Sequence, residues 1–263
     1  LNRYDGYSFK VYRPEAENGN SLSDRWITSI QEDRDGFIWI GTRQGGLNRF
    51  DPRSGLFTVY KHDPNDTSTL SNNHVNALFL DKSYALWVGT DSDLDRFDGE
   101  SDSFIHYIGS EDGLDNSVSA IYEDTAGFLW IGVKDNGLYQ LNEKTNSFKS
   151  FKSTDTSNTL SDNNVTSIAE DFDGNLWVAT RSGLNRFKPS TQTFVRYLQN
   201  PEKSESISSN DVHHLYVDHN GVLWIGTSNG LDIYNVQLNT FIHYRHQPVN
   251  PGSISNNIIY SIH

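Results

Sequence analysis

Short apolar runs alternate with polar turns along the whole chain. Each run holds four to six residues, mostly β-branched or aromatic, and is bounded by Gly, Asp, Asn or Pro, which is the composition of β-strands. No segment keeps apolar residues at positions i, i+3, i+4 and i+7 for the length of a helix. The pattern therefore predicts an all-β protein.

Five of these runs contain the same phrase, a Trp between aliphatic residues that is usually followed by Gly-Thr. Successive copies lie 48, 43, 47 and 47 residues apart, a period typical of four-stranded propeller blades. The apolar residues are consecutive rather than alternating, so we expect a strand that is covered on both faces. The five tryptophans are predicted to be core residues: Trp39, Trp87, Trp130, Trp177 and Trp224.

Each copy also predicts four strands in a fixed order. In the fourth copy they are Val165–Glu170, the Trp phrase, Leu184–Phe187 and a segment around Phe194 and Tyr197. The first turn usually begins with Asp and has Gly three residues later, a pattern in which Asp bonds the backbone ahead and Gly supplies positive φ. We predict a β-propeller with five complete blades, at residues 21–67, 68–113, 114–158, 159–205 and 206–252.

The two ends of the chain resemble parts of further blades. Residues 1–20 match the end of a repeat, with third and fourth strands within residues 1–12, and residues 253–263 match the start of another, with a first strand at 254–262. Neither end adds a Trp phrase, and the chain contains no Met. We expect residues 1–263 to form a single propeller region that is an arc of a longer array.

The charge and the missing cysteines exclude several classes of function. The 21 Lys and Arg against 34 Asp and Glu give a net charge of −13, which weighs against a nucleic-acid or anionic-membrane partner. The chain has no Cys, hence no disulfide, zinc knuckle or thiol nucleophile. No apolar run is long enough to span a membrane. We expect no contact of this chain itself with nucleic acid or membrane.

Candidate chemistry is sparse. The segment Asp91–Asp95 resembles the start of a calcium loop, but Arg96 stands where such a loop needs Gly, and Asp102 where it needs Glu. The sequence has no phosphate-binding Gly loop and no nucleophile elbow. We therefore predict no catalytic residue, no metal site and no cofactor.

The polar loops offer a better candidate site. The Ser- and Asn-rich caps before each first strand lie at the same end of a blade as the second-to-third-strand loop, because the first two strands are antiparallel. The caps also have a purely structural interpretation, since Ser and Asn satisfy loop backbone groups. Arg would bind carboxylate or sulfate and Trp would stack on a sugar, although Trp26 could instead fill a gap between loops. The predicted ligand-binding residues are Trp26, Arg43, Asn73, Lys134, Asp135, Asn164 and Arg181.

Residues Arg34–Thr42 followed by Gly46–Phe50 resemble the two-component regulator propeller repeat, and similar copies cover essentially the whole chain. The second copy departs from the pattern at Lys82-Ser83-Tyr84, which replaces the Gly turn, and at Asp93, which replaces the loop Gly. The resemblance implies a seven-bladed propeller in the periplasmic sensor region of a membrane-bound bacterial hybrid histidine kinase or diguanylate cyclase.

The resulting hypothesis is a non-catalytic sensor module of a two-component system. It would bind a small polar ligand such as an oligosaccharide, pass the signal to a kinase or cyclase output, and form a homodimer in the full-length protein. Two alternatives remain: a scaffold that recognises another protein through its loops, and a propeller lyase or hydrolase. An enzyme would draw on rim carboxylates that show no recurrent pair, namely Asp91, Asp93, Asp135 and Asp162.

Overall fold

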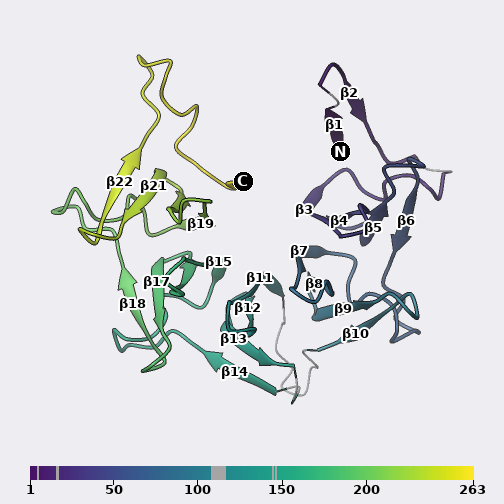
Figure 1. Cartoon of the computed structure of the whole chain (residues 1–263), viewed down its shortest axis with the longest axis horizontal. Helices are drawn as coiled ribbons and strands as arrows, with labels where there is room; N and C mark the ends of the chain where they lie inside the picture. Colours follow the sequence, from purple (N-terminus) through teal and green to yellow (C-terminus); the bar gives the residue numbers. More distant parts are fainter. Residues whose placement is uncertain (5, 16–17, 108–116, 144, 146) are drawn as a thin grey trace. The chain divides into compact units, whose positions relative to one another are not determined.

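Every regular element among the described residues is a β-strand. The computed structural model describes residues 1–4, 6–15, 18–107, 117–143, 145 and 147–263. This part of the chain holds five sheets of four strands and one sheet of two strands, all antiparallel between the neighbours whose register is defined. In each four-stranded sheet the strands are neighbours in chain order (Figure 1). None of the described residues belongs to a helix long and apolar enough to cross a membrane.

The sheets are bounded as follows. The two-stranded sheet pairs β1 (Asn2–Tyr4) with β2 (Phe9–Val11). The next two contain β3 (Ile27–Glu32), β4 (Ile38–Thr42), β5 (Leu47–Phe50) and β6 (Phe57–Tyr60), then β7 (Val75–Leu80), β8 (Leu86–Thr90), β9 (Leu94–Asp98) and β10 (Ser103–His106). The third contains β11 (Val118–Glu123), β12 (Leu129–Val133), β13 (Gly137–Asn142) and β14 (Ser147–Phe151). The last two contain β15 (Val165–Glu170), β16 (Leu176–Thr180), β17 (Gly183–Lys188) and β18 (Thr193–Tyr197), then β19 (Val212–Val217), β20 (Leu223–Thr227), β21 (Gly230–Asn235) and β22 (Thr240–Tyr244).

The chain forms two compact units, unit 1 at residues 1–121 and unit 2 at residues 122–263. Within each unit, neighbouring sheets are joined through their first strands. In unit 1, Thr28 Oγ1 on β3 donates to the carbonyl of Val75 on β7 at 2.6 Å. In unit 2, Thr166 Oγ1 on β15 donates to the carbonyl of Val212 on β19 at 2.7 Å. The predicted boundary between residues 113 and 114 lies outside the described residues.

One aspartate fixes both the first turn and the tryptophan of each four-stranded sheet. Asp171 Oδ1 accepts the backbone N–H groups of Asp173 and Asn175, at 3.1 and 2.9 Å. Its Oδ2 accepts the indole Nε1–H of Trp177 at 2.8 Å. A buried indole N–H needs such a partner, so the turn and the core strand are specified together. The other pairs are Asp33–Trp39, Asp81–Trp87, Asp124–Trp130 and Asp218–Trp224, at 2.7–3.0 Å.

Four of the five repeat tryptophans are buried as predicted, at 0–3 % exposure: Trp39, Trp87, Trp130 and Trp177. Trp177 packs against Tyr234 on β21 of the next sheet, with ring centroids 4.7 Å apart, and Trp130 packs in the same way on Phe187. Trp224 is only half-buried, because no third-strand aromatic of a following sheet covers it among the described residues. The core prediction is therefore confirmed for the first four tryptophans, whereas Trp224 is less buried than they are.

Two other features differ from the sequence expectation. Residues 254–262 do not form the predicted first strand, since no second strand among the described residues pairs with them. They lie along β20 instead, where Ile259 donates its N–H to the carbonyl of Thr227 at 3.0 Å. The turn at Lys82-Ser83-Tyr84 keeps the common geometry without Gly, because Tyr84 adopts a φ of 67° in the Gly position.

Candidate functional site

The loop ends of several sheets rest on a recurring set of buried polar side chains. Ser71 lies before β7, Thr90 ends β8 and Asp95 lies on β9. The Ser71 hydroxyl lies 2.7 Å from Thr90 Oγ1 and donates to Asp95 Oδ2 at 2.8 Å. Thr90 and Asp95 are fully buried, so these groups hold the loops and do not face a ligand. The same set recurs as Ser161, Thr180 and Asn185, and as Ser208, Thr227 and Asp232.

The third residue of the cap also serves the fold. Asn73 Oδ1 accepts the backbone N–H of His62 at 2.9 Å, and the Asn73 carbonyl accepts the N–H of Gly46 at 2.9 Å. Asn163, Asn210 and Asn257 make the same side-chain bond, each at 2.7 Å. The ligand contact predicted for Asn73 stays a prediction, and it would use the side-chain NH2 group, because the side-chain oxygen is already bonded to His62.

Two positions per repeat differ in character from sheet to sheet, and we call them the variable rim. One is the residue directly before the first strand and the other is the first residue of the second-to-third-strand loop. Their backbones are joined, since Arg43 donates its N–H to the carbonyl of Trp26 at 3.0 Å and Arg181 to that of Asn164 at 3.2 Å. The variable rim consists of Trp26 and Arg43, His74 and Asp91, Ser117 and Lys134, Asn164 and Arg181, and Asp211 and Ser228.

In unit 1 the rim presents an open aromatic group. Trp26 is 62 % exposed, and the Arg43 guanidinium carbon lies 5.8 Å from its ring centroid. The two side chains of the next rim pair contact each other, since His74 Nδ1 lies 2.7 Å from Asp91 Oδ2. Asp91 Oδ1 also accepts from Ser117 Oγ at 2.9 Å. The structure thus brings Trp26 and Arg43 together, as the sequence predicted them to share a site, and leaves the ring accessible.

In unit 2 most predicted rim residues have internal partners. Asn164 Nδ2 donates to Asp135 Oδ1 at 3.3 Å. Arg181 Nη1 donates to Asp211 Oδ1 at 2.9 Å and lies 2.8 Å from His213 Nδ1. Lys134 is exposed and has no hydrogen bond or ion pair with a described residue. Arg181 is therefore not the open anion-binding fork that its sequence position suggested, since an aspartate already neutralises it.

Sequence reasoning missed that Asp211, His213 and Ser228 join this cluster. His213 Nε2 lies 2.9 Å from Ser228 Oγ, which donates to Asp211 Oδ2 at 2.5 Å. Burial opposes the charged form of Asp211, but the hydrogen bonds from Ser228 and Arg181 outweigh burial and lower its pKa. Burial lowers the pKa of His213. The sequence did contain an indication of this cluster, because Asp211 and Ser228 occupy the two variable positions of the last repeat.

The direction of each hydrogen bond decides whether His213 can act as a base toward Ser228. Arg181 is only a donor, so His213 Nδ1 must accept and the ring proton must sit on Nε2. His213 therefore donates to Ser228, and Ser228 donates to Asp211. A general base has to accept the serine proton, and His213 faces Ser228 with its N–H instead. The cluster is a closed hydrogen-bond network that does not activate Ser228.

The aspartates of the calcium-like segment face different partners. Asp91 bonds His74 and Ser117, whereas Asp95 is fully buried against Ser71 and His106. Within the part of the chain that the structure describes, no three His, Asp or Glu side chains are grouped closely enough to share a metal ion.

We expect the stability of the protein to fall as the pH rises through about 9. His106 Nδ1 lies 2.7 Å from Asp95 Oδ1, and its Nε2 lies 2.8 Å from the carbonyl of Thr67. The hydrogen bond to Asp95 raises the pKa of His106 to about 9, against the opposing effect of burial. A group whose pKa is raised in the folded state stabilises the fold. This contribution is fully present below the unfolded pKa of about 6.5 and is lost as the pH rises from there through the folded pKa.

Urea unfolding at pH 6, 8 and 10 measures this effect, with His106→Gln as the matched variant. The protein should lose stability from pH 6 to pH 8 and further from pH 8 to pH 10, and the variant should lose less over both intervals. Equal pH profiles for the two proteins would show that His106 does not carry the charge.

Two family models match the sequence. Residues 21–44 and 69–92 match the model described as two component regulator propeller. The chain belongs to the two-component regulator propeller family. Residues 115–247, about half of this propeller chain, match the model described as SMP-30/Gluconolactonase/LRE-like region, so the chain belongs to that family as well.

Solved structures agree with this assignment. The extracellular domain of a hybrid two component system from B. thetaiotaomicron is 27 % identical, with a TM-score of 0.83 over 100 % of this propeller chain and 34 % of its own. The extracellular domain of a one component system from the same organism is also 27 % identical, with a TM-score of 0.69 over 88 % and 31 %. The propeller chain thus spans about a third of the length of each. No functionally curated protein is significantly similar to it.

A more distant likeness shows the fold alone. Virginiamycin B lyase from Staphylococcus aureus is 13 % identical, with a TM-score of 0.65 over 89 % of this chain and 74 % of its own. Together with the five four-stranded sheets, these structures confirm the predicted all-β propeller of four-stranded blades.

Proposed function

We propose that this chain is a ligand-binding sensor module of a bacterial two-component system, located on the outer side of the cytoplasmic membrane. Its similarity to the extracellular domains of a hybrid and a one component system supports this function. In a Gram-negative cell this location is the periplasm. The signal would pass to a kinase or cyclase output, with two copies of the full-length protein acting as a homodimer.

The observation that carries the ligand-binding proposal is the open Trp26–Arg43 pair on a rigid frame. The framework residues repeat from sheet to sheet, whereas the rim residues change, which is how repeat folds build a binding face. A ring that is 62 % exposed beside a guanidinium suits a sugar face whose neighbouring group is a hydroxyl or a carboxylate. The net charge of −13 opposes long-range attraction of anions, so neutral or weakly acidic oligosaccharides fit best.

We propose that the module is not itself an enzyme. The lyase likeness lies at 13 % identity and supports only the fold, although the gluconolactonase-like match keeps catalysis as the competing function. In the Ser228–His213–Asp211 group, His213 presents its N–H to Ser228, and this direction opposes nucleophilic attack by Ser228. Release of product from an oligosaccharide by the purified chain, lost in Ser228→Ala, would contradict this proposal.

The binding proposal is tested by titration. A panel of neutral, uronic-acid and sulfated oligosaccharides is screened by thermal shift, and each hit is titrated by calorimetry. Trp26→Ala should weaken binding about tenfold or more, and Arg43→Ala by a smaller factor. Tyr7→Ala is the matched control, because Tyr7 is 97 % exposed but lies outside the rim, and it should bind like the parent. Unchanged affinity in both rim variants would place the ligand elsewhere.

A further inference from the structure

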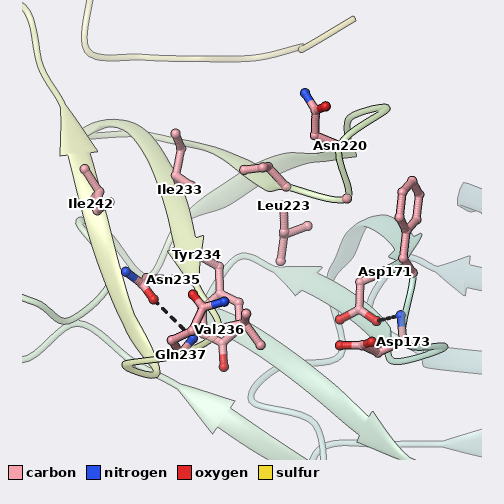
Figure 2. Close-up of a pocket in the computed structure, with 13 residues that line it drawn as sticks. Asp171, Asp173, Asn220, Leu223, Ile233, Tyr234, Asn235, Val236, Gln237 and Ile242 are labelled. Carbon is pink, nitrogen blue, oxygen red and sulfur yellow. Dashed lines mark hydrogen bonds between the residues drawn. The ribbon is translucent and has the colours of Figure 1, made fainter.

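A groove in unit 2 lies at the end of the sheets opposite the variable rim. The first turns of two adjacent sheets and the third-to-fourth-strand turn of the second sheet enclose about 360 Å³ (Figure 2), which is within the range of small-molecule sites. The three turns contribute Asp171–Asp173, Asn220–Leu223 and Asn235–Gln237, and the strands contribute Ile233 and Ile242. The groove lies entirely within unit 2 and shares no residue with the rim.

Its walls include apolar side chains and an exposed aromatic ring. Leu223 and Tyr234 are buried beneath it, at 3 % and 9 % exposure, whereas Phe172 is 71 % exposed. Phe172 packs on Gly221, since a Cβ at residue 221 would lie 2.8 Å from the ring. Gly221 also has a φ of +79°, which favours Gly at this contact. The backbone therefore supports the Phe172 ring, and most of the ring stays open.

The groove carries negative charge that no lining residue neutralises. Figure 2 shows the Asp171 and Asp173 carboxylates close together on one side of the groove, with Ile233 on the other side. Asp171 accepts only from uncharged donors, and the Asp173 carboxylate has no partner among the described residues. The described lining includes no Lys, Arg or His. Arg186 lies over the ring of Trp177 at 5.6 Å and does not line the groove.

The corresponding turns of unit 1 hold a cation of the chain itself. Arg34 takes the place of Phe172, and Tyr84 takes the place of Gly221. The Arg34 guanidinium carbon lies 5.5 Å from the Tyr84 ring centroid, and its Nε lies 4.0 Å from Asp35 Oδ2. Unit 1 therefore places a cation between an aromatic ring and a carboxylate, whereas unit 2 has the ring and the carboxylates without the cation.

We propose that the unit 2 groove binds an organic cation, an ammonium group on an apolar body. The ammonium group would lie against the Phe172 ring, where cation–π attraction is favourable, with Asp173 and Asp171 as its counter-charges. The apolar body would contact Leu223 and Ile233. The net charge of −13 attracts such a ligand from a distance. This site is independent of the sensor function proposed for the rim.

The test uses benzyltrimethylammonium chloride as the probe and benzyl alcohol as an uncharged analogue. Calorimetric titration of the whole chain should show saturable binding of the cation, about tenfold tighter than that of benzyl alcohol. Phe172→Ala should weaken binding about tenfold. Asp173→Asn, which keeps the shape and removes the charge, should weaken it and reduce its dependence on salt.

Three further variants distinguish binding in this groove from binding elsewhere on the chain. Phe172→Arg copies Arg34 of unit 1 and should abolish binding while the melting temperature stays within a few degrees. Asp35→Asn, at the matching turn of unit 1, and Trp26→Ala, at the rim, should both bind the probe like the parent. The proposal is overturned if the cation does not saturate, if benzyl alcohol binds equally well, or if Phe172→Ala and Asp173→Asn leave the affinity unchanged. Loss of binding in Trp26→Ala would move the cation to the rim and would also overturn it.

Discussion

Replacing Trp177 with Ala is expected to lower the free energy of unfolding by about 3–5 kcal/mol, as for other large core residues. Trp177 is fully buried, donates to Asp171 at 2.8 Å and packs against Tyr197 of its own sheet and Tyr234 of the next. The substitution removes this packing and leaves the Asp171 carboxylate without its indole donor, so the turn is weakened as well. Urea unfolding followed by circular dichroism measures the change.

Trp26→Ala is the control for this experiment. Trp26 is the one tryptophan of the six that is exposed, and surface substitutions usually change stability by less than about 0.5 kcal/mol. Similar losses for Trp177→Ala and Trp26→Ala would contradict the assignment of the Trp phrase to the core.

Asp95→Ala is expected to cost about 3 kcal/mol, because it removes one partner of a buried ion pair. Asp95 is fully buried and accepts from Ser71, while the side chain of His106 is 28 % exposed. Both ring nitrogens of His106 face oxygen acceptors, so the ring carries two protons and its charge would lose its counter-ion. The partial exposure of His106 places the effect at the lower end of the range for buried pairs.

Another sheet of the chain has a different pair of residues at these two positions. In the sheet β15–β18, the positions of Asp95 and His106 are occupied by Asn185 and Arg196, and Arg196 donates to the carbonyls of Thr159 and Leu160, at 2.8 and 2.6 Å. The double variant Asp95→Asn/His106→Arg should therefore recover most of the stability that Asp95→Ala loses. A double variant as unstable as Asp95→Ala would show that the two positions do not act as a pair.

Much of the fold could be predicted because the same pattern of strands and turns occurs five times in the sequence. The predicted first strand of the fourth copy, Val165–Glu170, has the observed bounds. The Asp–Trp bond was not predicted, although the two residues are six apart in every copy. Its geometry depends on how the turn folds back over the strand, and residue types alone do not give that geometry.

The site was less predictable because its residues find partners across sheets. Position in a loop correctly suggested that Trp26 and Arg43 lie together, since both belong to one repeat. Arg181 was misjudged because its partner, Asp211, lies 30 residues away in the next repeat. Asn73 looked like a rim residue but joins two segments through His62. A sequence pattern shows which side chains are polar, whereas only the packing of neighbouring sheets shows which of them remain open.

The most direct test of ligand sensing at the rim is acrylamide quenching of tryptophan fluorescence with and without an oligosaccharide that calorimetry shows to bind. Trp26 is 62 % exposed, and four of the other tryptophans are at most 3 % exposed, so Trp26 should dominate the quenchable signal. Trp26→Phe should remove most of that signal. If the ligand binds at the rim, a saturating concentration protects this same component from acrylamide. A ligand that binds fully and leaves the quenchable component unchanged would contradict the assignment of the rim as the sensing site.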